Sequence, residues 1–232
     1  MKNIAIFVFT LPLCLCGRVT KTTTETTEAV TAADTIKAII IPNIDSLKKY
    51  TTMDNLTLTK QFELFDQERY DKRLDKSNKV LMEFLPDGTC VRMTDYDKSY
   101  GILPPDSYFE LVKIYYPNGF IKMKGWEYVD VFMAGIWYEF NERGTLVAEV
   151  DYDAPFTFTF DDVLEFCRKN KIEVQKGYVS QGTGFHTSIN RWVEDGEPVW
   201  YIDYLKEWNL IEILYLDGKT GKIICKETSD WH

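Results

Sequence analysis

The chain has 232 residues, of which 45% are hydrophobic and 15% aromatic, and its formal net charge is −9 at pH 7. The acidic balance argues against nucleic acid as a partner, because proteins neutralise the phosphate backbone with Lys and Arg. The aromatic content favours strands over helices, and the apolar content is enough for a core in one large or two small domains.

The first fifteen residues have the order of a secretory signal. Lys2 supplies a positive charge, and an apolar run from residue 4 to residue 15 follows it, interrupted by Pro12. A membrane-spanning helix needs about 20 apolar residues, so this run is too short to be a span. We therefore predict a signal peptide at 1–15 and a mature chain that begins near residue 16.

The end of this signal, LCLCG at 13–17, resembles the lipobox of bacterial lipoproteins. In a lipobox, a Leu stands three residues before a Cys that is acylated and becomes the new N-terminus. The resemblance implies lipidation of Cys16, with Cys14 as a second candidate; an ordinary cleaved signal is the alternative. Because each buried methylene adds about 0.8 kcal/mol of membrane affinity, such an anchor would hold the chain at the bacterial cell envelope, in the periplasm or at the outer-membrane surface.

Residues 16–35 are rich in Thr and have no aromatic side chain. Such a segment cannot bury enough apolar surface to offset its ordering entropy, so we predict a flexible tether. The triplets that begin at Asp34 and Asp45 resemble the Asp-Ser/Thr-aliphatic sequon of protein O-glycosylation in Bacteroides-type bacteria. The resemblance implies glycosylation at Thr35 and Ser46, with plain loop residues as the alternative.

Residues 36–79 are expected to form a lead-in segment that packs on the strands after it. The run at 39–41 is typical of a strand ended by Pro42, and the charged stretch 65–79 is either a short helix or a solvated loop.

Residues 80–153 repeat a strand, turn, strand pattern three times. The predicted strands cover 80–85 and 89–93, 111–116 and 120–124, and 136–140 and 145–150. Each turn contains a Gly that can take the positive φ that tight hairpins need, at Gly88, Gly119 and Gly144. The pattern predicts a meander of stacked β-hairpins.

The second and third hairpins carry a resemblance. YYPNGFI at 115–121 and GIWYEF at 135–140 resemble MORN-type hairpin repeats, which occur in many bacterial exported and antitoxin-like proteins. In such repeats, the aromatic residue before the turn and the Trp after the Gly stack along the sheet. The resemblance clearly covers about 35 residues.

Nine aromatic residues lie between positions 115 and 140. Because alternation in a strand sends about half of the side chains outward, some of these rings are expected to form a contact surface. Core packing is the alternative. We predict a binding face of Tyr116, Trp126, Tyr128, Trp137 and Tyr138.

The last part, 154–232, begins with an amphipathic helix. Phe160, Val163, Leu164 and Cys167 follow the i, i+3, i+4, i+7 spacing of a buried stripe, and Thr159 starts a capping-box pattern. Strands are predicted at 189–193, 199–205, 210–216 and 222–226. The overall fold class is therefore α+β and mostly antiparallel: a hairpin meander followed by a helix-plus-antiparallel-sheet unit.

This last unit carries a second resemblance. GEPVWYID at 196–203 and YLDGKTGKII at 215–224 are similar to PepSY domains, which are extracytoplasmic modules with a proposed protease-regulating role. The departure is Gly218, where Ala is common. The Thr-Gly of the closing motif is a turn signal, so it indicates fold more than function.

No catalytic motif stands out. His186 lies in a small-residue loop without a second His or a Cys nearby, and 95–106 begins like a calcium loop but has Tyr100 where Gly is needed, so we predict a solvated loop there. We predict no catalytic residue, metal ligand or cofactor. The odd cysteine number indicates either three buried apolar residues or one bridge and one thiol, among Cys90, Cys167 and Cys225.

Together these features predict an envelope-anchored, non-catalytic lipoprotein that binds a protein or peptide and contacts the membrane through its N-terminal lipid. The family resemblances imply an inhibitor or immunity-type protein whose acidic, aromatic face meets a basic partner. The alternative is a carbohydrate-binding or glycan-processing surface protein in which Trp126 and Trp137 stack on sugar rings. A structural envelope component is a third hypothesis.

Overall fold

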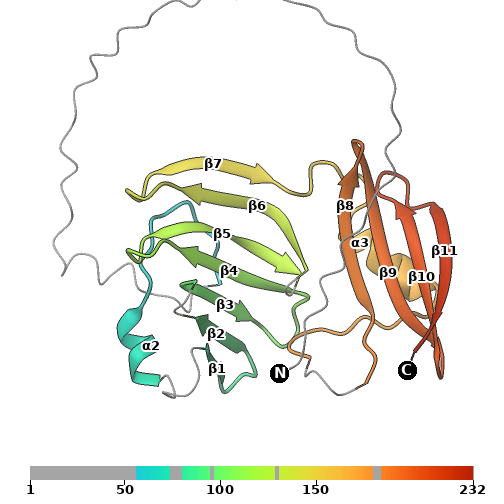
Figure 1. Cartoon of the computed structure of the whole chain (residues 1–232), viewed down its shortest axis with the longest axis horizontal. Coiled ribbons are helices and arrows are strands. Elements are labelled where there is room, and N and C mark those ends of the chain that lie inside the picture. The colour runs from blue at the N-terminus through green and yellow to red at the C-terminus, as the bar shows by residue number, and fades with distance from the viewer. Residues whose placement is uncertain (1–55, 74–79, 95–96, 129–130, 180–183, 232) are drawn as a thin grey trace, which may run out of the picture. The chain divides into compact units, whose positions relative to one another are not determined.

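The computed structural model describes residues 56–73, 80–94, 97–128, 131–179 and 184–231. These residues belong to one compact unit. They form a seven-stranded antiparallel meander, a helix and a four-stranded antiparallel sheet, so the predicted fold class and element order are confirmed (Figure 1).

The meander is built in strict chain order. Each strand pairs with the one that follows it, which keeps every connection short. Its strands are β1 (Val80–Phe84), β2 (Cys90–Thr94), β3 (Ser99–Leu103), β4 (Phe109–Tyr115), β5 (Ile121–Tyr128), β6 (Phe132–Phe140) and β7 (Leu146–Asp151).

The three predicted hairpins are confirmed as β1–β2, β4–β5 and β6–β7. Gly88, Gly119 and Gly144 have φ angles of 88°, 84° and 77°, a region that favours glycine. Each turn is closed by a side-chain oxygen that accepts from a backbone N–H two residues later, at Asp87, Asn118 and Asn141.

The solvated loop predicted over 95–106 is wrong for its central part, because 99–103 form β3 between β2 and β4. Tyr100 and Ile102 enter the core, with 1% and 2% of their surface exposed. On the other face, a Cβ at Gly101 would lie 1.9 Å from Oε1 of Glu110, so Glu110 needs glycine beneath it. Pairing on both sides makes this segment a strand.

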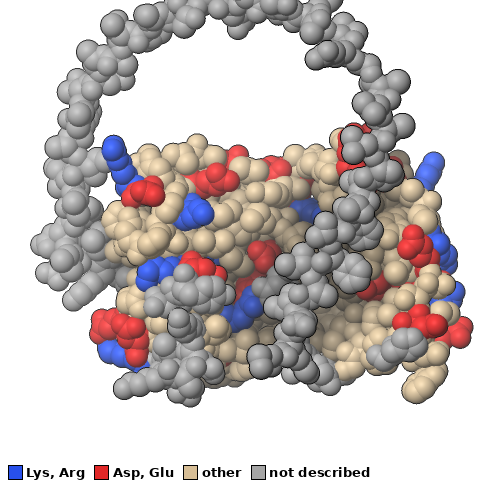
Figure 2. Space-filling model, viewed as in Figure 1, with Lys and Arg blue, Asp and Glu red and all other residues tan. Residues whose placement is uncertain are grey.

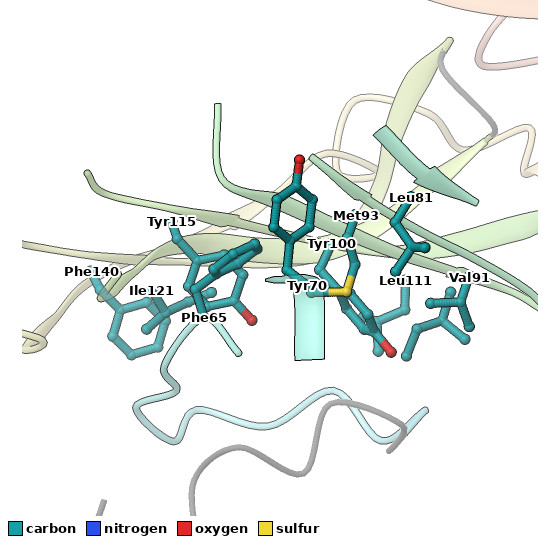
Figure 3. Packing of buried hydrophobic residues seen from close by; sticks show 11 residues of the cluster. Phe65, Tyr70, Leu81, Val91, Met93, Tyr100, Leu111, Tyr115, Ile121 and Phe140 are labelled. Carbon is teal, nitrogen blue, oxygen red and sulfur yellow. The ribbon is translucent and has the colours of Figure 1, made fainter. Parts of the chain in front are cut away.

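The described part of the lead-in packs on one face of the meander. Phe65 donates its backbone N–H to the carbonyl of Gly119 at 2.8 Å, and helix α2 (Gln67–Arg73) follows. Phe65 and Tyr70 are buried against the strands, as Figure 3 shows. The other buried members of this first core cluster are Leu81, Val91, Met93, Tyr100, Ile102, Leu111, Tyr115, Ile121 and Phe140. The run 39–41 lies outside the described residues.

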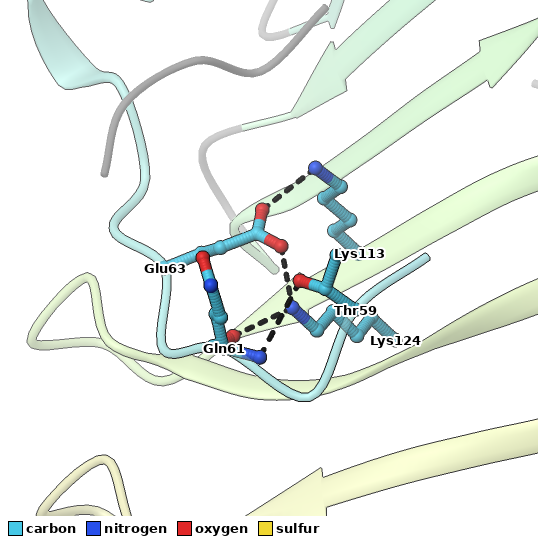
Figure 4. A network of polar contacts seen from close by, with 5 residues as sticks. All are labelled: Thr59, Gln61, Glu63, Lys113 and Lys124. Atoms are coloured by element: carbon cyan, nitrogen blue, oxygen red, sulfur yellow. Dashed lines mark hydrogen bonds and ion pairs between the residues drawn. The ribbon is translucent and has the colours of Figure 1, made fainter. Parts of the chain in front are cut away.

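A buried ionic network fixes the lead-in to the sheet (Figure 4). Glu63 accepts from Lys113 of β4 at 2.6 Å and also from Lys124 of β5. The Lys124 ammonium donates in addition to the carbonyl of Gln61 at 2.6 Å. The Lys113 and Lys124 side chains are only 2% and 0% exposed, so the one carboxylate serves two buried cations.

The predicted helix is α3 (Phe160–Lys169), and its capping box is present. Thr159 accepts from the backbone N–H of Asp162, and the Asp162 carboxylate accepts from the backbone N–H of Thr159. Val163 and Cys167 of the predicted stripe are buried. The second sheet follows as β8 (Ser188–Glu194), β9 (Glu197–Glu207), β10 (Leu210–Asp217) and β11 (Ile223–Asp230), close to the predicted strands.

A second core cluster joins α3 to both sheets. Trp200 of β9 is completely buried, and its ring meets Phe132 of β6 edge to face with a centroid distance of 5.6 Å. Arg191 of β8 donates to the carbonyl of Met133 and to the carboxylate of Asp153, both at 2.6 Å. The two sheets therefore share buried apolar and polar contacts.

Close packing between β5 and β6 depends on a glycine. A Cβ at Gly125 would lie 2.3, 2.4 and 2.4 Å from three ring atoms of Trp137, which is fully buried. We therefore expect Gly125→Ala to lower the free energy of unfolding by about 1–3 kcal/mol, the usual cost of overpacking. Urea unfolding of the variant and of the unchanged chain measures this loss of stability. In a Trp137→Leu background the same substitution should cost much less, and an unchanged cost would contradict this origin.

Candidate binding surfaces

Of the five aromatic residues predicted to form a binding face, Trp137 does not reach the surface. Its side chain is 0% exposed, and its indole N–H donates to the carbonyl of Trp126 at 2.9 Å. The pairing of β5 with β6 is irregular between Lys124 and Trp126, and Gly125 at that point leaves room for the indole. Including Trp137 in the binding face was therefore wrong.

The other four predicted residues are half-buried. Trp126 and Tyr138 pack against the first core cluster, and Tyr128 packs against the second. Tyr116 donates its hydroxyl proton to the carbonyl of Phe140 at 2.8 Å. Core packing, the alternative interpretation, accounts for most of this aromatic density.

A different aromatic surface lies on the outer face of the four-stranded sheet. Trp192 of β8, Tyr201 of β9 and Tyr215 of β10 are half-buried, and their ring centroids are 5.5–6.3 Å apart. Trp200, Ile202 and Leu214, which alternate with these residues, are buried in the cluster that contains α3. Helix α3 thus covers one face of the sheet and leaves the aromatic face outward (Figure 1).

This outer face is acidic as well as aromatic. Among the described positions that alternate outward in β8–β11, none is Lys or Arg, and the carboxylates there include Glu194, Glu197, Asp203, Asp217 and Glu227. Lys219, in the turn after β10, pairs with Glu197 at 2.6 Å. Burial and the neighbouring Asp203 raise the pKa of Tyr201 to about 12. Burial also raises the pKa of Asp203 itself, although the Ser188 amide donates to it. We call the three rings with these carboxylates the acidic aromatic face.

Two lysines of the same sheet are paired on its opposite face. Lys206 and Lys226 contact the buried carboxylate of Glu212 at 2.5 and 2.8 Å. Although burial opposes ionisation, bonds from these lysines and from Tyr204 lower the pKa of Glu212 to about 2. These cations therefore do not neutralise the acidic aromatic face. Figure 2 shows acidic and basic side chains close together on the side of the molecule that it draws.

A cavity of about 470 Å³ opens between the meander and the chain segment that leads into β8. The backbone of Gly177 anchors this segment by donating to the carbonyl of Ser107 at 2.8 Å. Side chains of β1, β2 and β3 form one side of the cavity. The lining residues are Met82, Cys90, Arg92, Leu103, Ser107, Tyr108, Tyr128, Val131, Gln175, Gly177, Tyr178, Val179, His186, Thr187 and Ser188.

The cavity brings together residues that are far apart in the sequence. Tyr128, predicted for the aromatic binding face, and His186, from the small-residue loop, both line it. Tyr108 and Tyr178 line it too, although no local sequence pattern marks either of them. The tight turn at Asp195 and Gly196 pairs Trp192 with Val199, so alternation within each strand could have placed Trp192 and Tyr201 on the face opposite Trp200, which is the signal for the acidic aromatic face.

The predicted lipidation site Cys16 and the glycosylation sites Thr35 and Ser46 lie outside the described residues. Among the described residues, no helix combines the length and the apolar character that a membrane span needs.

The three cysteines of the folded part differ in exposure. Cys90 and Cys167 are buried, and burial raises the pKa of both thiols. Cys225 is exposed, so the prediction of three buried cysteines was wrong. Within the described ranges, no group of three or more His, Cys, Asp or Glu is placed to hold a metal ion.

Comparison of the chain with family models, with curated proteins and with solved structures finds no match. The MORN-type and PepSY-like resemblances therefore stay predictions, and the function is inferred from the surfaces of this chain itself.

Proposed function

We propose that this protein is an envelope-anchored, non-catalytic lipoprotein that binds a basic protein or peptide through its acidic aromatic face. The observation that carries the proposal is the combination of three clustered rings with an excess of carboxylates on one sheet face. The anchor rests on the lipobox-like sequence at 13–17, whose resemblance implies cleavage after residue 15 and lipidation of Cys16.

The chemistry of the face favours cationic side chains. The faces of Trp and Tyr rings attract Lys and Arg by about 0.5–2 kcal/mol for each contact, depending on desolvation. Carboxylates around the rings add charge-assisted hydrogen bonds and steer a basic partner during encounter. An acidic partner would meet like charges, which cost binding energy. An inhibitor or immunity-type protein that neutralises a basic effector fits this chemistry.

The test uses two variants of the face and two matched controls. Tyr201→Ala removes a central ring, and Glu227→Lys reverses an exposed charge beside it. Trp208→Ala and Glu142→Lys make comparable changes at exposed positions off the face; Trp208 is 85% exposed. The chain and its variants are immobilised and compared for capture of native envelope proteins, and then for affinity to the protein recovered.

We expect both face variants to weaken binding at least tenfold, which corresponds to about 1.4 kcal/mol, and both controls to bind like the unchanged chain. Binding should also weaken as salt is raised, because the contacts are partly exposed to solvent. A recovered partner that binds the face variants and the unchanged chain equally well would refute the proposal.

A further inference from the structure

Strand β11 forms one edge of the four-stranded sheet, and its outer side is open (Figure 1). All eight of its residues are exposed, although β10 pairs with the strand along its length. Its sequence, IICKETSD, contains no Pro, and its one register irregularity lies between Ile223 and Cys225. Native sheets commonly blunt an edge with Pro or a bulge, because an open edge can pair with another chain. The regular stretch from Cys225 to Asp230 therefore remains able to pair.

The outward backbone groups of β11 belong to alternate residues. Trp231 donates its N–H to the carbonyl of Asn209 at 2.8 Å, so the backbone of residue 231 is directed toward β10. In an antiparallel ladder, residues that exchange hydrogen bonds with one neighbour alternate with residues whose N–H and C=O point the other way. The outward row is therefore Lys226, Thr228 and Asp230, and within the described chain no strand pairs with it.

The side chains of this row are not balanced in charge within one copy. On the sheet face that α3 covers, the one carboxylate of Glu212 contacts both Lys206 and Lys226, so this cluster has one positive charge in excess. Asp230 lies on the same face by alternation, and it forms no ion pair with the described residues. Because four residues of a strand span about 13 Å, Asp230 cannot reach Lys226 of its own strand.

We propose that two copies of this protein dimerise by pairing their β11 strands antiparallel, in a register centred on Thr228. A twofold axis perpendicular to the sheet pairs Thr228 with Thr228 of the second copy and places Lys226 opposite Asp230 of the second copy, twice by symmetry. Each residue of the outward row then exchanges backbone hydrogen bonds, and each cross-strand pair of opposite charge contributes about 0.2–1 kcal/mol. Registers centred on Lys226 or on Asp230 would place like charges opposite each other. Charge complementarity thus favours a second copy as the occupant.

The dimer would join the two four-stranded sheets into one continuous sheet. Because the twofold axis is perpendicular to the sheet, both acidic aromatic faces would lie on the same side and could bind one partner with two basic segments, which raises avidity. The dimer itself does not rest on the proposed function, because the three rings of that face take no part in the pairing of β11.

Cross-linking tests the register. In the full chain used for it, Ser replaces Cys14, Cys16 and Cys225, so that neither acylation nor a stray disulfide joins two copies. Thr228→Cys would bring two Cα atoms to about 5.5 Å, within the range of roughly 4.4–6.8 Å that a disulfide spans. Glu227→Cys is the matched control, because its two copies would be diagonal neighbours about 7–8 Å apart. Under mild oxidation we expect a disulfide-linked dimer from Thr228→Cys and at least fivefold less from Glu227→Cys, measured on non-reducing gels.

Sedimentation of the same cysteine-substituted chain over a concentration series tests the contacts. Thr228→Pro removes an N–H that points away from β10, and Asp230→Lys places lysines opposite each other. We expect each to weaken dimerisation at least fivefold, while Glu142→Lys, the matched charge change elsewhere, and Tyr201→Ala leave it unchanged. Circular dichroism confirms that each variant is folded.

Three results would overturn the dimer. One is a chain that stays monomeric up to about 1 mM, even if a peptide strand of another sequence binds to β11. Another is a dimer that folded Thr228→Pro and Asp230→Lys form as readily as the unchanged chain. The third is equal cross-linking at Thr228→Cys and Glu227→Cys. Capture of a basic partner by the acidic aromatic face is measured separately, so failure of either proposal leaves the other testable.

Discussion

Replacement of Glu63 by Gln is expected to lower the free energy of unfolding by about 3–5 kcal/mol at pH 7, because it leaves buried charges without a counter-ion. The carboxylate of Glu63 is the partner of both Lys113 and Lys124, whose side chains are 2% and 0% exposed. Gln keeps the shape of the side chain but not its charge. The lead-in would then lose its ionic attachment to β4 and β5 (Figure 4).

The same variant should respond to pH with a definite sign. Burial lowers the pKa of Lys124, while Glu63 opposes that shift. A lysine with a lowered pKa in the folded state binds fewer protons there than in the unfolded chain, where its pKa is about 10.4. Its contribution to stability therefore rises with pH between these two values. Without Glu63 the folded-state pKa falls further, so the variant should recover part of its lost stability between pH 7 and pH 9.5.

Urea unfolding at the two pH values measures both effects. Glu149→Gln is the control, because Glu149 pairs with Lys60 at 2.6 Å and both side chains are largely exposed, at 41% and 57%. Such solvent-exposed pairs contribute little to stability, because water and salt screen them. Equal losses in the two variants, or a deficit in Glu63→Gln that does not shrink at high pH, would contradict the role assigned to the buried network.

The second large effect is expected for Trp200→Ala, which should cost about 3–5 kcal/mol. The Trp200 ring is fully buried, it contacts Phe132 and Phe156, and its indole N–H donates to the carbonyl of Phe158 at 2.9 Å. Its removal leaves a cavity and an unpaired carbonyl between the two sheets.

Because the second core cluster contains residues of both sheets, we expect both to be weakened by this change, with one cooperative transition at lower urea. Trp208→Ala, at a side chain that is 85% exposed, should change stability by less than about 0.5 kcal/mol. Tryptophan fluorescence and far-UV circular dichroism follow the transition. A variant in which the meander keeps its original midpoint while the four-stranded sheet unfolds early would show that the shared cluster does not couple them.

Local signals predicted most of the elements. The turn glycines at Gly88, Gly119 and Gly144 act within four residues of chain, so the hairpins around them could be found without tertiary information. Helix α3 could be predicted equally well, since its apolar stripe and its Thr159 cap are both local sequence features. Strand β3 was missed because its five residues have no strong alternation and are ordered by pairing on both sides.

The candidate sites were harder to predict from the sequence than the fold. An aromatic side chain on a strand can lie on either face of the sheet, and the element that covers one face decides which rings stay exposed. In the meander, the lead-in covers one face of the sheet. On the other face, Gly125 leaves room for the buried ring of Trp137. Most of the expected binding face is therefore core. In the four-stranded sheet, α3 covers the face of Trp200 and leaves Tyr201 outside.

The sequence by itself therefore determined the leader-like N-terminus, the acidic charge, the hairpins and the capped helix, because these depend on composition or on neighbours a few residues apart. Only the tertiary structure decided which aromatic residues are exposed, which carboxylate serves two buried lysines and which segments line the cavity. Those features join positions as distant as Met82 and Ser188. They follow from how the layers cover one another, and no local pattern encodes that coverage.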